Sequence, residues 1–104
     1  MKFLNLTPHT LTIDTIGVLE PTGILPRCAT VRGVPRYVGG VRVIEQTVGA
    51  VTGLPYAVEG INLIVSGMVL AALNGTRPDV FAPDTGPDAV RVNGQIVSVL
   101  GLVQ

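Results

Sequence analysis

The sequence predicts one β-rich domain of the α+β class, made of short, mostly antiparallel strands with one short helix. Its 104 residues are the length of a single domain, which we place at residues 1–104. Thirteen glycines and eight prolines interrupt the chain every few residues. The segments between them are short and rich in Val, Ile, Leu and Thr. This pattern is typical of many short strands joined by tight turns, and we expect six to eight strands in a partly closed sheet or sandwich.

Four short strands are predicted in the first half of the chain. Residues 2–6 form the first, and the alternation of apolar and polar residues over 11–14 predicts a half-buried second strand. The intervening Thr7-Pro8-His9 is expected to be the turn of a hairpin that these two strands form. Alternation returns over residues 27–33 and 41–48, which predicts two longer strands.

The segments around these longer strands are predicted to be turns and loops. Residues 18–21 lead into a turn at Thr22-Gly23. Residues 35–40, Pro-Arg-Tyr-Val-Gly-Gly, indicate an exposed hairpin tip or a flap. Residues 49–60 contain Gly-Leu-Pro and Glu-Gly turn signals, so we expect a loop that crosses over the body of the protein.

The second half is predicted to contain the one helix and the clearest hairpin. A buried strand over 61–65 is followed by Ser66 as an N-cap, a helix over 67–73, and Asn74-Gly75 as a C-cap signal. Prolines make residues 77–84 extended or looped. The hairpin follows, with a strand over 89–92, the turn Asn93-Gly94, and a strand over 95–100. Asn-Gly between two apolar runs is the strongest local hairpin signal.

Composition limits the classes of partner. Seven basic and seven acidic residues give a formal net charge of zero, which argues against a general binder of nucleic-acid polymers or membrane surfaces. Charged residues make up 13% of the chain and hydrophobic residues 47%. So few charges on a small domain leave apolar surface exposed, and we therefore expect a homo-oligomer. Six of the seven basic residues are arginines, which suits bidentate contacts to phosphate or carboxylate as well as a GC-rich genome.

Several features favour a soluble protein of the cytoplasm. Cys28 is the sole cysteine, so no internal disulfide can form. The first five residues turn polar too early for a signal peptide. The longest apolar stretch, residues 61–73, is too short to span a bilayer.

The run Asn5-Leu6-Thr7-Pro8-His9 is the most concentrated group of polar side chains in the chain. It offers amide, hydroxyl and imidazole groups within five residues and contains the single histidine. Pro8 stiffens the run. His9 has two interpretations: a turn residue that orders the N-terminal strands, or a ligand contact that stacks on a base or bonds to a hydroxyl or phosphate.

Four further residues are candidate ligand contacts, each with a structural alternative. Ser66 combines a hydroxyl with a helix start, or is simply a cap. Arg27 opens a strand and is expected on an inward face, where Glu45 or a bound anion would pair with it. Arg77 and Asp79 either close a loop with a local salt bridge or clamp a phosphate and a ribose hydroxyl.

The sequence gives no strong support for catalysis or for a metal or other cofactor. One histidine and one cysteine cannot form a His/Cys metal cluster of ordinary spacing. A Cys28–His9 nucleophilic pair is formally available, but Cys28 lies in a strand pattern. Asp79, Asp84 and Asp88 lie in a Pro/Gly-rich segment where carboxylates usually serve turns. We therefore expect no catalytic residue and no cofactor.

The order of the motifs resembles a group of short phage and prophage proteins. The likeness covers nearly the whole chain and rests on Asn-Leu-Thr-Pro-His near the start, the most specific motif. It continues through Pro-Thr-Gly before Arg27, Val-Thr-Gly-Leu-Pro, Ile-Val-Ser, and Arg-Pro-Asp-Val-Phe-Ala-Pro-Asp. The resemblance implies a phage origin and action in the host cytoplasm. Small phage proteins of this kind often counter host defence, some as sponges that hold a nucleotide-derived immune signal without cleaving it.

Residues and resemblance together predict a protein that sequesters a small phosphorylated ligand, a cyclic nucleotide or a derivative of ADP-ribose. The expected ligand contacts are Asn5, Thr7, His9, Arg27, Ser66, Arg77 and Asp79. Two other classes stay open. One is a phage structural or assembly protein, and the other is a small hydrolase of the same ligand class that uses His9 with Asp79 or a metal.

Overall fold

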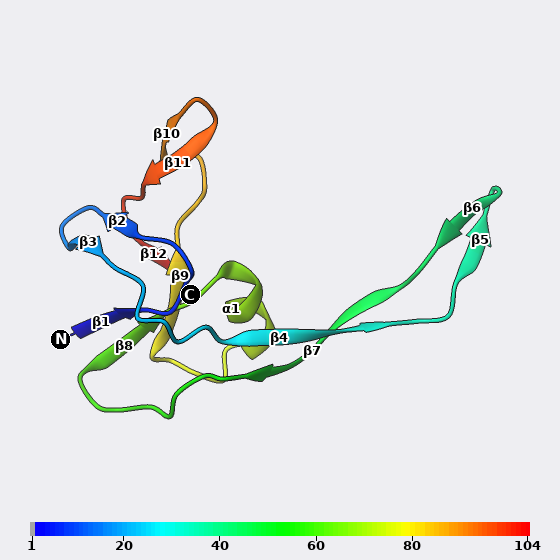
Figure 1. The fold of residues 1–104 in the computed structure, drawn as a ribbon, viewed down its shortest axis with the longest axis horizontal. Helices are drawn as coiled ribbons and strands as arrows, with labels where there is room; N and C mark the ends of the chain where they lie inside the picture. Colours follow the sequence, from blue (N-terminus) through cyan, green and yellow to red (C-terminus); the bar gives the residue numbers. More distant parts are fainter. Residues whose placement is uncertain (1) are drawn as a thin grey trace.

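The computed structural model describes residues 2–104 and is a β-rich α+β domain (Figure 1). Its elements follow one another as β1(Lys2–Asn5), β2(Leu11–Ile13), β3(Gly17–Leu19), β4(Arg27–Arg32), β5(Arg36–Val38), β6(Val41–Val43), β7(Gln46–Thr52), β8(Ile61–Ile64), α1(Gly67–Leu73), β9(Val80–Pro83), β10(Val90–Val92), β11(Gln95–Ser98) and β12(Leu102–Val103). Short antiparallel strands and one short helix were predicted, and both are confirmed. The described residues contain more strands than expected, because the predicted strand 41–48 is divided between β6 and β7 and because β3, β5, β9 and β12 form outside the predicted strands.

A four-stranded sheet forms the centre of the body, in the order β1-β8-β9-β12. β8 pairs in parallel with β1 on one side, where Phe3 lies opposite Asn62, and with β9 on the other, where Leu63 lies opposite Val80. β12 pairs antiparallel with β9. The helix α1 connects β8 to β9, which is the usual crossover between adjacent parallel strands.

Both faces of this sheet are covered, and each face has its own apolar core. On one face, Val69 of α1 packs with Leu63, Val65 and Val80, all at most 4% exposed. On the other face, Ile64 of β8 is fully buried. It packs with Ile13, Ala89 and Val99, which come from the hairpin segments beside the sheet. The alternation along β8 therefore sends successive side chains into two different cores.

The caps of the helix confirm the sequence prediction. Ser66 accepts a hydrogen bond on Oγ from the Val69 N–H at 3.3 Å. Asn74 ends the helix in the left-handed conformation at φ 50°, and its N–H donates to the Ala71 carbonyl. The predicted limits of the helix, residues 67–73, match the observed ones.

Two small hairpins lie beside the sheet, β2-β3 and β10-β11. The second was predicted from Asn93-Gly94, and both residues have the positive φ that its turn requires, 53° and 80°. The expected hairpin between residues 2–6 and 11–14 is wrong, because β1 pairs with β8 and β2 pairs with β3. Thr7-Pro8-His9 is a turn, but it leads from the central sheet into the layer formed by the two hairpins and their flanking residues, 11–20 and 88–100, which we call the hairpin layer.

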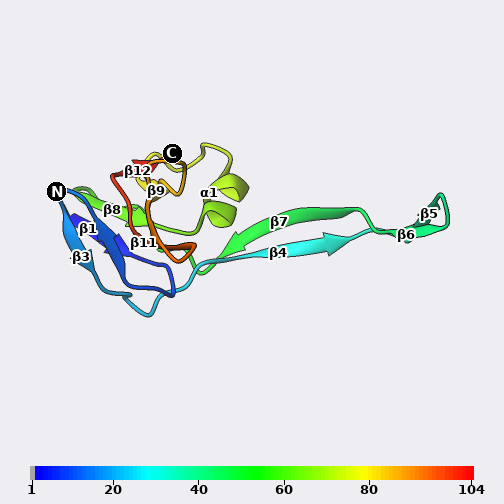
Figure 2. The same cartoon turned by 90° about the horizontal axis from the view of Figure 1, so that it is seen from above.

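A long antiparallel arm leads away from the body (Figures 1 and 2). Its base is the β4-β7 pair and its tip is the β5-β6 hairpin, which confirms the predicted hairpin tip. The radius of gyration is 16.3 Å, against about 13 Å for a compact domain of this length. The strand predicted over 41–48 is interrupted between β6 and β7, and the predicted loop 49–60 begins only after Thr52.

The central position of β8 leads to a stability prediction. Ile64→Ala should lower the free energy of unfolding by about 3 kcal/mol, because Ile64 is fully buried and its loss leaves a cavity. Urea denaturation measures this change. Ile96→Ala is the matched control on a strand, because Ile96 is 41% exposed, and its effect should stay below about 1 kcal/mol. Equal effects of the two substitutions would contradict the assignment of β8 as the central strand.

Candidate functional site

The three parallel strands end at one edge of the central sheet, and the segments that follow them surround a groove. β1 leads to Thr7, β8 leads to Ser66, and β9 leads to Thr85. The groove has a volume of about 430 Å³, within the range of small-molecule sites. The carboxyl ends of parallel strands are where open α/β sheets generally bind ligands. Its lining residues are Thr7, Pro8, His9, Thr10, Leu11, Ser66, Gly67, Pro83, Thr85, Ile96 and Val99.

The groove combines an apolar wall with hydroxyl groups and one imidazole. Ile96 and Val99 of the β10-β11 layer face the same space as Pro8 and Pro83. His9 is exposed, so its ring is open to solvent and to a ligand. This mixture of flat apolar surface and neutral polar groups suits a molecule that has both a ring system and hydroxyl groups.

The loop that carries His9 is held from beneath by the amide of Asn5. Asn5 is 1% exposed, and its Nδ2 donates to the carbonyls of His9 at 2.7 Å and Leu19 at 2.9 Å. Its Oδ1 accepts from the N–H of Thr7 at 2.9 Å and from the Thr7 hydroxyl at 2.6 Å. All four hydrogen-bonding positions of the amide are thus used within the chain. Asn5 shapes the groove by fixing the loop, since it has no position left with which to contact a ligand.

A second, smaller cavity of about 140 Å³ shares Thr7, Pro8 and Ser66 with the groove. Arg27 lines this cavity at the start of β4. Arg27 is exposed, which is at odds with the expected inward face. Glu45 is not its partner, because Arg27 lies opposite Thr52, whereas Glu45 precedes Gln46, which lies opposite Arg32 at the other end of the β4-β7 pair. None of the described residues that line the two cavities is Asp or Glu, so the Arg27 guanidinium has no acidic neighbour in the lining.

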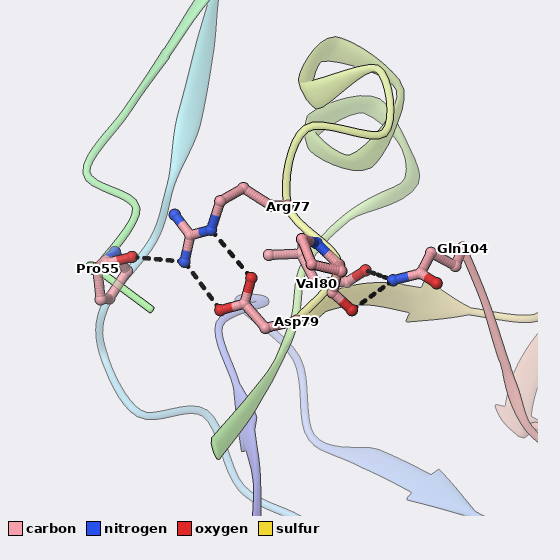
Figure 3. Close-up of polar contacts among 6 residues, drawn as sticks. Pro55, Arg77, Asp79, Val80 and Gln104 are labelled. Carbon is pink, nitrogen blue, oxygen red and sulfur yellow. Dashed lines mark hydrogen bonds and ion pairs between the residues drawn. The ribbon is translucent and has the colours of Figure 1, made fainter. Parts of the chain in front are cut away.

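Arg77 and Asp79 lie at a different place, where the chain returns from the arm (Figure 3). The Arg77 guanidinium donates through Nε and Nη2 to the two carboxylate oxygens of Asp79, both at 2.9 Å, and through Nη2 to the Pro55 carbonyl at 2.9 Å. This bidentate pair holds the pKa of Asp79 below its usual value and raises that of Arg77. The pair therefore fastens the loop after α1 to the segment after β7.

Arg77 also lines a cavity of about 690 Å³ beside α1, which is larger than the His9 groove. This cavity includes Leu70, Pro78 and Gln104 but neither His9 nor Arg27. Gln104 is tied down there, because its Nε2 donates to the carbonyls of Pro78 at 2.7 Å and Val80 at 3.1 Å. The predicted site residues thus fall into two groups, with Thr7, His9, Ser66 and Arg27 together and Arg77 with Asp79 apart.

Some groove residues were not predicted from the sequence. Thr85 and Ile96 enter the site only because β9 lies beside β8 and the β10-β11 hairpin lies over the sheet. Thr10 was also missed, and its hydroxyl donates to Glu20 at 2.9 Å. The position of Thr10 directly after Thr7-Pro8-His9 is the one local signal that could have identified it as a groove residue.

The geometry of the described residues bears on the catalytic alternatives. Within residues 2–104, no three His, Cys, Asp or Glu side chains gather closely enough to hold a metal ion. Cys28 is half-buried on β4 and does not line the His9 groove, and Asp79 does not line it either. In the described part of the chain, no helix is long and apolar enough to cross a membrane.

Comparisons with protein-family models, with curated proteins and with solved structures gave no match to this chain.

The buried amide of Asn5 can be tested with an isosteric change. Asn5→Asp should lower the free energy of unfolding by about 2–4 kcal/mol, because a carboxylate cannot donate to the carbonyls of His9 and Leu19. Amide hydrogen exchange at Thr7 and His9 should become faster. Thr7→Val removes only the hydroxyl from the same network and should cost less. An Asn5→Asp protein with unchanged stability and exchange would show that the loop is held by other contacts.

The Arg77–Asp79 pair predicts a pH dependence of stability. The pKa of Asp79 is lowered in the folded protein, so the pair stabilises above the unfolded value, about 3.9, and the contribution is lost as pH falls through the folded value. Asp79→Asn should therefore destabilise by about 1 kcal/mol at pH 7 and progressively less as the pH falls below 4. Urea midpoints of both proteins between pH 2 and pH 7, roughly the window that the lowered pKa defines, measure this. Asp88→Asn is the control on an exposed carboxylate, and a constant difference across the range would exclude the pair as its source.

Proposed function

We propose that this protein binds a small phosphorylated ligand in the His9 groove and holds it without cleaving it. The observation that carries this proposal is the meeting of the three loops after β1, β8 and β9 around one groove whose neighbouring cavity contains Arg27. The ligand class is a nucleotide-derived signalling molecule, such as a cyclic nucleotide or a derivative of ADP-ribose. In the setting of a phage infection, such sequestration in the host cytoplasm would counter a defence that depends on the signal.

Each chemical part of such a ligand has a matching group in the lining. A base would lie against the apolar wall at Ile96 and stack on or bond to the His9 ring. Ribose hydroxyls would bond to Thr7 and Ser66, which line both cavities. The phosphate would lie at Arg27, a permanently charged donor of paired hydrogen bonds. Arg77 is less suited to this task, because Asp79 already occupies two of its donors.

Rigidity would supply the affinity that net charge does not. The loop from Thr7 to His9 is fixed by Pro8 and by the amide of Asn5. A preformed site loses little conformational entropy when the ligand enters. The chain as a whole is neutral, so long-range attraction contributes little to the selection of an anionic ligand.

A second candidate function is that of a phage structural or assembly protein. The observation that favours it is the arm, in which every residue from 29 to 42 is exposed. Projecting arms of this kind suit contact with neighbouring subunits. The two functions differ in what they require of the groove, because an assembly protein has no need to retain a ligand.

Ligand retention distinguishes these functions. The protein is incubated with cyclic nucleotides and ADP-ribose derivatives, freed of unbound ligand and heat-denatured, and the released molecules are identified by mass spectrometry. Intact ligand supports sequestration, altered ligand supports a hydrolase, and no retained ligand supports the assembly protein. His9→Ala and Arg27→Ala should each weaken retention by at least about tenfold, or 1.4 kcal/mol.

The matched control for Arg27 is Arg32→Ala, on the same strand but outside both cavities. Arg32→Ala should retain ligand as the unchanged protein does. Circular dichroism shows that each variant is folded. If His9→Ala and Arg27→Ala both retain ligand at full strength, the groove is not the binding site.

A further inference from the structure

The arm, which we define as residues 27–52, exposes many of its large apolar side chains. A two-stranded hairpin by itself is at best marginally stable in water. Here the ribbon extends beyond the body with no third strand beside it among the described residues (Figure 2). Six of its large apolar side chains are more than half exposed: Val31, Val34, Tyr37, Val38, Val41 and Val48. A surface of this composition is typical of an element that is covered in an assembly.

The charges of the chain divide between the arm and the body. The arm carries four arginines, Arg27, Arg32, Arg36 and Arg42, and one acidic residue, Glu45, for a formal charge of +3. The rest of the chain has three basic and six acidic residues, for a formal charge of −3. The net charge of zero therefore conceals a cationic arm and an anionic body of equal magnitude. Surfaces of opposite charge on one chain are complementary between two copies of that chain.

The hairpin layer is the part of the body that best matches the arm. A groove of about 450 Å³ runs between its two hairpins, lined by Asp14, Val90 and Leu100 among others. Val90 and Leu100 are 46% and 54% exposed. The layer has three exposed acidic residues, Asp14, Glu20 and Asp88, and one basic residue, Arg91, for a formal charge of −2. At the tip of the arm, Tyr37 lies opposite Arg42 on the paired strand, and this ring with its neighbouring guanidinium fits a groove that has apolar walls and one carboxylate, Asp14.

We propose that the arm of one copy docks on the hairpin layer of a second copy, so that the protein assembles by reciprocal exchange of arms. The arm cannot reach the hairpin layer of its own body, because it leads away from it (Figures 1 and 2). In the exchanged arrangement, each cationic apolar arm meets an anionic apolar surface, and the exposed side chains of both are covered. This proposal does not depend on the ligand of the His9 groove.

A basic ribbon with a tyrosine at its tip also suggests nucleic acid, but the observations favour a second copy. A nucleic-acid contact is dominated by cations that neutralise phosphates. The arm has more large exposed apolar side chains than arginines, and the anionic body would be repelled by a polyphosphate backbone. Nucleic-acid binding is therefore an outcome that the experiment must be able to reveal.

Paired charge reversals on the full chain test the proposal. One variant, Arg36→Glu with Arg42→Glu, makes the tip acidic, and the other, Asp14→Lys with Asp88→Lys, makes the hairpin layer basic. Sedimentation equilibrium should show that the unchanged protein associates and that each variant alone dissociates at least about tenfold more readily. An equimolar mixture of the two variants should associate again, because every arm then meets a surface of opposite charge.

The apolar contribution has a matched control. Tyr37→Ser with Val38→Thr should also weaken association by at least about tenfold. The same replacements at Tyr56 and Val58, which are 94% and 57% exposed but lie outside the arm, should have no effect. Circular dichroism confirms that all variants are folded, so that loss of association is not loss of structure.

Three results would overturn the proposal. The first is an unchanged protein that stays monomeric at about 100 µM, where even weak specific complexes form. The second is a mixture of charge-reversed variants that stays as dissociated as its components. The third is a monomer that binds duplex DNA or RNA and loses this binding on Arg36→Glu with Arg42→Glu, which would assign the arm to nucleic acid.

Discussion

The burial of β8 between two apolar layers is the constraint on which the body of this protein depends. Its side chains enter two different cores, with Leu63 facing the helix α1 and Ile64 facing the hairpin layer. Neither layer would be stable by itself, since α1 has only seven residues and an isolated two-stranded hairpin is marginally stable. The helix and the hairpins are thus held in place by the strand that they cover. Parallel pairing of β8 with β1 and β9 follows from the same packing, and it brings the ends of three strands to one edge.

Asn5 fixes the conformation of the loop that follows β1 at this edge of the sheet. The end of β1 would otherwise release a polar loop with unsatisfied carbonyl groups against the hairpin layer. The amide of Asn5 instead bonds to two carbonyls and to the N–H and hydroxyl of Thr7, which fixes the loop as far as His9. A polar residue in a core is tolerated when every one of its hydrogen-bonding positions is used. Within the most polar motif of the sequence, Asn5 is therefore buried and supports the loop, whereas His9 is exposed and lines the groove.

The features that the sequence predicts well are those that neighbouring residues determine. The helix over 67–73 has its cap at Ser66 and its stop at Asn74, and the hairpin at Asn93-Gly94 depends on two residues with positive φ. Pairing between distant segments was not predictable in this way. The pairing of β1 with β8 joins residues about sixty positions apart, and no local pattern distinguishes it from a β1–β2 hairpin. For the same reason Thr7, His9 and Ser66 were identified singly, whereas the walls at Thr85 and Ile96 appeared only with the assembled sheet.

Arg27 lies at the junction between the body and the arm. The body is held by its two apolar clusters, whereas the arm beyond Arg27 adds little to either. Arg27 is the first residue of β4 and also lines the cavity that it shares with Thr7 and Ser66. The base of the arm is therefore a wall of the candidate site. If the arm is docked on a second copy, β4 is held in one orientation and Arg27 is held with it. A ligand that bonds to Arg27 would then bind more tightly in the assembled state, and by linkage the ligand would stabilise the assembly by the same factor.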